Sequence, residues 1–240
     1  MKIKNILLAC LALLFSAVGL QALNNDKVAN YYKSLIKSNY GKDVEVKVVG
    51  SQTYRGFEVA NVEIISGDDK TKHFMFVKDS FIFDDIHDLN TAKSLRESLV
   101  KDNIVKKAKE DKEYYKLGKG NNQKWLFLDT DCAHCKNEVK KLGDMLKDTS
   151  LNIVFLNIIG DEYGAVKTVH LEKELKSKKS DKDKVAVIEK YFNYNPFDLQ
   201  ATKDEIQAIK NRSKKFVDLG LEYVPFIIDI EQGLGKWKKL

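Results

Sequence analysis

The chain has 240 residues, of which 43% are hydrophobic and 32% charged, with 41 Lys and Arg against 35 Asp and Glu and a formal net charge of +6. It contains only three cysteines and two prolines, which excludes collagen-like and low-complexity chains and small disulfide-stapled scaffolds. The length allows one large or two small domains, with enough apolar residues for real cores.

The N-terminal segment, residues 1–22, has the layout of a secretory signal peptide. Two lysines precede an apolar run over residues 6–18 that is too short to span a membrane comfortably. Small residues follow, and we expect cleavage after Ala22 and export of the remaining chain. A lipoprotein signal at Cys10 is the alternative, but only three apolar residues would precede that cysteine, and the apolar run continues past it.

Removal of the signal lowers the net charge to +4 and leaves two cysteines, Cys132 and Cys135. Only three of the basic residues are arginines, the side chain best suited to bidentate contacts with bases and phosphates. No basic stripe is interleaved with aromatic residues. We therefore interpret the charge as a solvated surface and expect no nucleic-acid partner.

After the signal, the sequence predicts a helix followed by an antiparallel meander. Apolar side chains recur at helical spacing over residues 26–39, and Gly41 follows as a stop signal. From Val44 the period changes to two, and strand-like runs separated by polar turns continue to Phe83. The pattern predicts a small α+β domain over residues 23–89 that could dimerise.

The next segment, residues 90–118, is highly charged and carries apolar residues at helical spacing. We interpret it as a linker helix or helix pair, and an ordinary surface helix of one compact domain is the alternative. The glycine- and asparagine-rich residues 118–122 form a break, so we place the start of a C-terminal domain, residues 119–240, there.

The C-terminal domain begins with a strand–helix–strand pattern. Residues 125–128 form a continuous apolar run typical of a buried strand, a helical stripe runs from Cys135 to Leu146, and residues 152–159 form a second buried strand. A largely helical stretch over residues 161–220 precedes another apolar strand. These elements predict an α/β domain with a helical insertion.

The sequence Cys-Ala-His-Cys at residues 132–135 places two cysteines where the first strand meets the helix. The unpaired amides and the dipole of a helix N-terminus stabilise an anion, so Cys132 is predicted to attack a disulfide as a thiolate. Cys135, deeper in the helix, would resolve the mixed disulfide. Ala133 is small enough to admit a substrate. His134 favours the thiolate when protonated, whereas Asp131 is a like charge that opposes it.

The cysteine pair has two other interpretations. A zinc site would need a second cysteine pair or histidines at ligand spacing, which the histidines at positions 73, 87 and 170 do not have. A purely structural disulfide would close so short a loop that it would stabilise the fold little. We therefore expect a redox pair with no metal and no organic cofactor.

Pro225 opens an apolar strand although proline is disfavoured within strands. Together with the Cys-x-x-Cys pair at a strand–helix junction, it makes residues 119–240 resemble a thioredoxin-fold domain with a helical insertion. The resemblance implies that Pro225 is cis and lies against the cysteines. It also implies that Val224 offers its backbone to a substrate strand.

Taken whole, the chain resembles the DsbC/DsbG-like group of bacterial periplasmic disulfide isomerases. That group has a cystatin-like N-terminal dimerisation domain, a linker helix and a thioredoxin domain. The resemblance implies a periplasmic homodimer that isomerises or reduces wrong disulfides in exported proteins. It further implies a membrane thiol reductase as the redox partner.

Some residues depart from that group. Val224 and His134 look more like the DsbA-type oxidases, so a disulfide oxidase is an alternative activity. A periplasmic chaperone or binding protein with a structural disulfide is the alternative of another class. Thioredoxins carry a buried acid where this chain has Leu126, so Asp129 is the nearest candidate to take a proton from Cys135.

The C-terminus also departs from the usual fold. Thioredoxin domains normally continue through a last edge strand and a final helix. Residues 235–240 could supply the strand, but no residues remain for the helix.

Overall fold

The structure is a computed structural model that describes residues 24–193 and 198–230. The predicted signal peptide and the predicted last edge strand lie outside these residues. The chain divides into two compact units, with the division between Asp84 and Asp85. None of the helices in the described ranges is both long and apolar enough to cross a bilayer.

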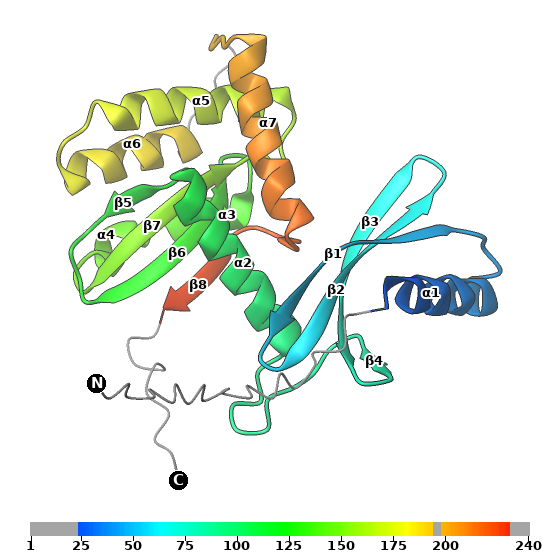
Figure 1. The fold of residues 1–240 in the computed structure, drawn as a ribbon. Helices are drawn as coiled ribbons and strands as arrows, with labels where there is room; N and C mark the ends of the chain where they lie inside the picture. Colours follow the sequence, from blue (N-terminus) through cyan, green and yellow to red (C-terminus); the bar gives the residue numbers. More distant parts are fainter. Residues whose placement is uncertain (1–23, 194–197, 231–240) are drawn as a thin grey trace, which may run out of the picture. The chain divides into compact units, whose positions relative to one another are not determined.

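The first unit is a helix on a four-stranded antiparallel sheet (Figure 1). Helix α1 (Asn25–Tyr40) starts at Asn24, whose side chain accepts a hydrogen bond from the Lys27 N–H, and ends at Gly41, which has a φ of 66°. The sheet has the order β1-β2-β3-β4, with bounds Glu45–Tyr54, Phe57–Ser66, Asp69–Lys78 and Phe81–Phe83. The predicted helix and meander are confirmed.

One face of this sheet packs against α1. Val28 and Tyr32 of the helix are buried against Ala60 and Val62 of β2 and Met75 of β3. Since successive strand residues point to opposite faces, the alternation in the sequence is what gathers these side chains on one side.

The second unit is built on a mixed sheet of order β5-β7-β6-β8. Strands β6 (Asn122–Asp129) and β7 (Thr149–Leu156) are parallel, and β5 (Tyr115–Leu117) and β8 (Phe226–Ile230) pair antiparallel to them at the two sides. Every residue of β7 is buried, as expected for a strand covered on both faces. The predicted strand–helix–strand unit is confirmed.

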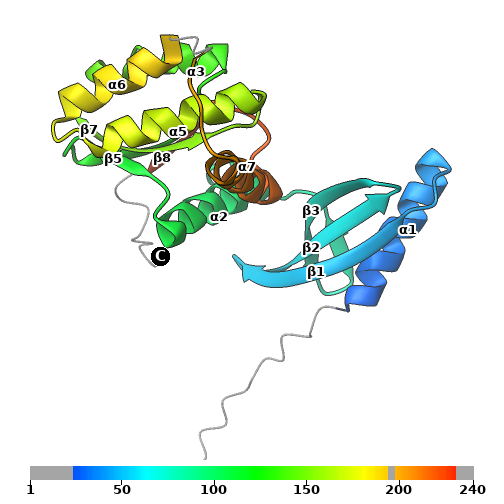
Figure 2. The ribbon, with the colours of Figure 1, turned by 90° about the horizontal axis from the view of Figure 1, so that it is seen from above.

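Helices cover both faces of this sheet (Figure 2). Their bounds are α2 Leu95–Asp111, α3 Ala133–Val139, α4 Leu142–Met145, α5 Glu162–Lys176, α6 Asp181–Asn193 and α7 Lys203–Asp218. Phe127 of β6 packs on Phe216 of α7, with ring centroids 5.3 Å apart. Phe155 of β7 points to the other face and packs on Phe192 of α6, at 6.4 Å.

The segment predicted as a linker helix is helical only over Leu95–Asp111. It ends at Lys112, which adopts the left-handed conformation with a φ of 54°. Tyr115–Leu117, expected at the end of the helix, forms strand β5 instead. Lys109 of α2 lies over the Trp125 ring, 5.8 Å from its centroid. The helix therefore packs within the second unit.

The predicted helical insertion consists of α5, α6 and α7. Helix α7 begins with a capping box in which Thr202 and Glu205 satisfy each other's backbone N–H groups. Its apolar face packs on α5 through the buried cluster Ala165, Val166, Val169, Ile206 and Ile209. Gly220, with a φ of 95°, ends the helix and turns the chain toward Val224 and Pro225.

Candidate functional site

Cys132 is the N-cap residue of α3, at the carboxyl end of β6. Its sulfur accepts a hydrogen bond from the Cys135 N–H, with Sγ and N 3.3 Å apart. The backbone of Cys132 is extended, with φ −81° and ψ 118°, while the helix begins at Ala133. The sulfur thus occupies the position where a capping oxygen usually sits, and unpaired helix amides favour negative charge there.

Cys135 lies deeper than Cys132. It is fully buried, whereas Cys132 keeps 4% exposure, and both are free thiols. Burial raises the pKa of the Cys135 thiol far above its ordinary value, and the neighbouring Cys132 and the charge of Asp129 act in the same direction. The pair is therefore asymmetric: Cys132 is the less deeply buried thiol, and Cys135 stays protonated behind it.

The loop before β8 meets the first cysteine. The Cys132 thiol donates a hydrogen bond to the Val224 carbonyl oxygen, with Sγ and O 3.3 Å apart. The Val224–Pro225 peptide bond is cis, as the resemblance implies. Tyr223, beside them, is 60% exposed. Residues separated by about 90 positions in the sequence thus converge on one sulfur atom.

Ala133 and His134 lie between the two cysteines and are exposed. The structure thus places all six residues named from the sequence in one region: four at the start of α3, and Val224 and Pro225 opposite them. Leu126, at the position of the thioredoxin acid, is fully buried in β6.

Asp129 is a buried carboxylate just behind the cysteines. Its Oδ2 accepts hydrogen bonds from the Ile158 and Ile159 N–H groups at 2.6 and 2.8 Å, and its Oδ1 accepts one from the Asp131 N–H at 2.9 Å. Its own N–H donates to the Cys135 sulfur at 3.5 Å. Asp129 thus clamps the turn before Cys132 to the loop after β7. Proton transfer through Asp129 stays a prediction.

Two side chains that were not predicted from the sequence, Thr130 and Lys167, also hold the turn before Cys132 in place. The Thr130 hydroxyl lies 3.3 Å from the Gly164 carbonyl oxygen and 3.4 Å from the Thr168 hydroxyl. Lys167 forms an ion pair with Asp131. A lysine within the run Gly-Ala-Val-Lys-Thr-Val at residues 164–169 is a signal that sequence reasoning could have used, because its neighbours are too small or apolar for a solvent-facing stretch.

No protein-family model and no curated protein matches the chain. Among solved structures, the chain is similar to DsbG of Helicobacter pylori, with 18% identity, a TM-score of 0.50, and coverage of 84% of this chain and 100% of that one. It is also similar to the thiol-disulfide exchange protein α-DsbA2 of Wolbachia pipientis, with 22% identity, a TM-score of 0.37, and coverage of 57% and 88%. The first likeness shows the fold: the second unit is a thioredoxin-like α/β domain carrying a Cys-x-x-Cys pair.

Proposed function

We propose that the protein is an exported thiol-disulfide oxidoreductase that isomerises or reduces wrong disulfides in other exported proteins. The observation that carries the proposal is the position of the Cys132 sulfur. It caps a helix N-terminus, lies 3.3 Å from the Val224 carbonyl oxygen and is backed by a second, buried thiol. The fold shared with Helicobacter pylori DsbG agrees with this activity.

The chemistry follows from the asymmetry of the two thiols. The Cys132 thiolate attacks one sulfur of a substrate disulfide, forming a mixed disulfide and releasing the other substrate sulfur as a thiolate. In isomerisation, another substrate thiolate attacks the mixed disulfide and returns Cys132 to the thiolate form. In reduction, Cys135 loses its proton and attacks Cys132, so the protein becomes oxidised and the substrate leaves with two thiols.

Each neighbour of the pair has a proposed role in this cycle. The Val224 backbone would hold an extended substrate segment beside Cys132, in the manner of an added strand, and Pro225 would shape that loop. Ala133 leaves room for the substrate, and protonated His134 stabilises the thiolate. The reaction needs no metal or organic cofactor, since the electrons come from thiols.

The proposal that the protein is exported is based on the signal-peptide layout of residues 1–22. We place the protein in the periplasm, where disulfides form and persist. Its substrates there would be exported proteins with non-native disulfides. Each reduction cycle leaves Cys132 and Cys135 oxidised, so a membrane thiol reductase is the proposed source of electrons.

The direction of the reaction separates an isomerase from the oxidase that His134 and Val224 suggest. We expect the Cys132–Cys135 pair to be mostly reduced in cells, because an isomerase must present a free thiolate. Acid quenching followed by alkylation with a maleimide–polyethylene glycol reports the state as a mass shift on a gel. A mostly oxidised pair would overturn the isomerase assignment and favour the oxidase, while leaving thiol-disulfide exchange intact.

We also propose that the first unit, within residues 23–89, is a cystatin-like dimerisation domain and that residues 90–118 link it to the catalytic domain. Its outer strand β1 spans ten residues, and no other strand of the described residues pairs with its free edge. Val49, at a bulge in this strand, is 54% exposed. An unpaired strand edge is a template for pairing with another chain.

Light scattering of the mature protein is expected to give twice the mass of one chain. Val49→Lys places a charge on the exposed edge and is expected to shift the equilibrium toward the monomer. A monomeric mass for the unsubstituted protein at micromolar concentration would rule out the homodimer.

A further inference from the structure

Asp131, the residue before Cys132, forms an ion pair with Lys167 of α5. The Lys167 Nζ lies 2.5 Å from Asp131 Oδ1, and the two side chains are 8% and 29% exposed. Lysine is rarely buried to this degree without a partner, because removing its charge from water is costly. Asp131 immediately precedes Cys132 in the chain, so the ion pair is part of the turn that leads into the sulfur that we propose as the nucleophile.

The fold leaves a defined space for this carboxylate. A Cβ atom added at Gly160 or at Gly164 would overlap Asp131 Oδ2 and the Asn157 side-chain nitrogen. Because neither position carries a side chain, the segment after β7 and the start of α5 leave room for the Asp131 carboxylate where it lies. Asp131 is therefore held in one place: Lys167 contacts one carboxylate oxygen, and the other fills the space above the two glycines.

The charges of Asp131 and Lys167 affect how readily the Cys132 thiol ionises. A carboxylate next to a thiolate destabilises it, and the effect is strong in a partly buried site because water screens it less. An ammonium group on that carboxylate cancels most of the repulsion. Resting on the proposed function, we propose that Lys167 is a positioning residue that acts through Asp131 to keep Cys132 in its thiolate form.

The other titratable groups on the elements around Cys132 are the same in every variant, so they do not account for a difference between variants. They are Asp129 in the preceding turn, His134, Cys135 and Lys136 on α3, Asp161 and Glu162 at the start of α5, and Glu222 and Tyr223 in the loop before β8. Burial raises the pKa of the Cys135 thiol, so Cys135 adds little thiolate absorbance below about pH 9. The absorbance of the ten tyrosines is removed by subtracting the titration of Cys132→Ser in the same background.

The test is a titration of thiolate absorbance at 240 nm in the reduced, purified protein. Lys167→Met leaves Asp131 unneutralised and is expected to raise the midpoint by about half a pH unit or more, a roughly threefold loss in the thiolate-to-thiol ratio. The double variant Asp131→Asn with Lys167→Met removes both charges and is expected to return close to the unsubstituted midpoint. Asp131→Asn alone is expected to lower it.

If the ion pair had only a structural role, both single variants would lose thermal stability. The Cys132 titration midpoint would not rise in Lys167→Met and fall in Asp131→Asn. An unchanged midpoint in Lys167→Met, or a double variant that stays as far from the unsubstituted protein as Lys167→Met, would overturn the proposal. If Lys167→Met does not fold, Asp131→Asn alone tests the proposal. A Cys132 midpoint that does not fall in Asp131→Asn would then overturn it. The titration needs no substrate, so it is independent of whether the protein catalyses exchange.

Discussion

Cys132→Ser is expected to slow the refolding of a scrambled disulfide protein to the rate measured without any catalyst. A serine hydroxyl does not ionise at neutral pH and cannot form the mixed disulfide with which exchange begins. The fold should survive the change, because serine is among the preferred N-cap residues and its oxygen can accept the Cys135 N–H bond that the sulfur now accepts. The measurement is the recovery of substrate activity in a glutathione buffer.

Cys135→Ser is the matched control, one helical turn away in the same pair. It keeps the attacking sulfur but removes the resolving one, so it is expected to accumulate a mixed disulfide with the substrate. That species runs as a larger band on a gel without reductant and disappears on reduction. If Cys132→Ser refolds the substrate as fast as the unsubstituted protein, the cysteines are not catalytic. The chaperone or binding-protein alternative would then stand.

Much of the fold could be predicted because two periodicities dominate the sequence. The change at Val44 from helical spacing to alternation marks where α1 gives way to the meander. The continuous apolar run at residues 125–128 belongs to a strand covered on both faces. Tyr115–Leu117 was missed because three residues are too few for a period, and only pairing with β7 makes them a strand.

The candidate site was predictable where local sequence decides chemistry. A Cys-x-x-Cys pair after an apolar run marks a strand–helix junction, and the structure places Cys132 at that helix start. Arg212 could not be found in this way, and Lys167 could be found only through the small and apolar residues around it. A charged residue in a helix usually faces water, and only the packing of other elements over α5 and α7 buries these two.

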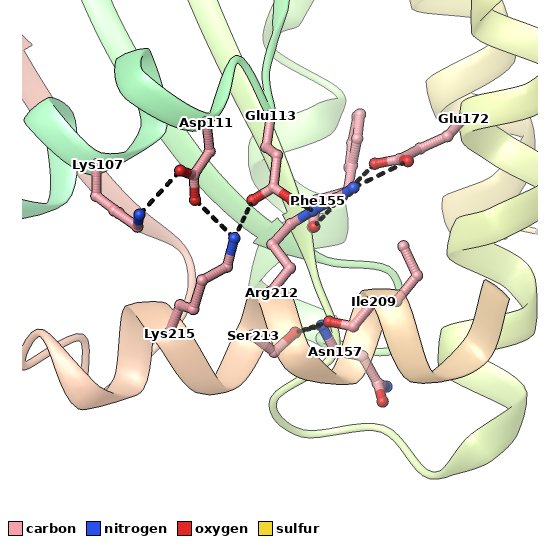
Figure 3. A network of polar contacts seen from close by, with 10 residues as sticks. All are labelled: Lys107, Asp111, Glu113, Phe155, Asn157, Glu172, Ile209, Arg212, Ser213 and Lys215. Atoms are coloured by element: carbon pink, nitrogen blue, oxygen red, sulfur yellow. Dashed lines mark hydrogen bonds and ion pairs between the residues drawn. The ribbon is translucent and has the colours of Figure 1, made fainter. Parts of the chain in front are cut away.

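Arg212→Met is expected to destabilise the second unit by about 3–5 kcal/mol, the usual effect of breaking a buried ion pair from one side. Arg212 of α7 donates to both carboxylate oxygens of Glu172 on α5 and to the Phe155 carbonyl oxygen of β7 (Figure 3). Its side chain and that of Glu172 are each 12% exposed. Methionine can fill the volume, but it leaves the Glu172 charge buried without its partner.

The pKa of Arg212 reflects the same balance. Burial, the largest single effect, acts to lower it, but the charge and hydrogen bonds of Glu172, together with the charges of Glu113 and Tyr115, raise the pKa above its ordinary value. The guanidinium is therefore charged at every working pH. Lys215, one turn further along α7, adds ion pairs to Asp111 and Glu113 at 2.6 and 2.9 Å. The helix is thus held to α5 and to the C-terminal end of α2 by ion pairs, and to β7 by the hydrogen bond from Arg212 to the Phe155 carbonyl oxygen.

Thermal unfolding followed by circular dichroism measures the effect, and for a domain of this size the expected loss is roughly 10 °C. Lys214→Met is the matched control, since Lys214 precedes Lys215 on the same helix and pairs with Asp218 while 72% exposed. It should change stability by less than about 1 kcal/mol. Arg212→Met with Glu172→Gln removes the stranded charge and should recover part of the loss.

The same change is expected to affect the candidate site through the end of α7. The Leu221 N–H donates to the Phe216 carbonyl oxygen at 3.0 Å, and Leu221 is 1% exposed, so the chain leading to Val224 is anchored on this helix. Loosening α7 should therefore weaken the contact between Val224 and Cys132 before the sheet unfolds. Arg212→Met no less stable than Lys214→Met would show that the buried network does not hold the insertion in place.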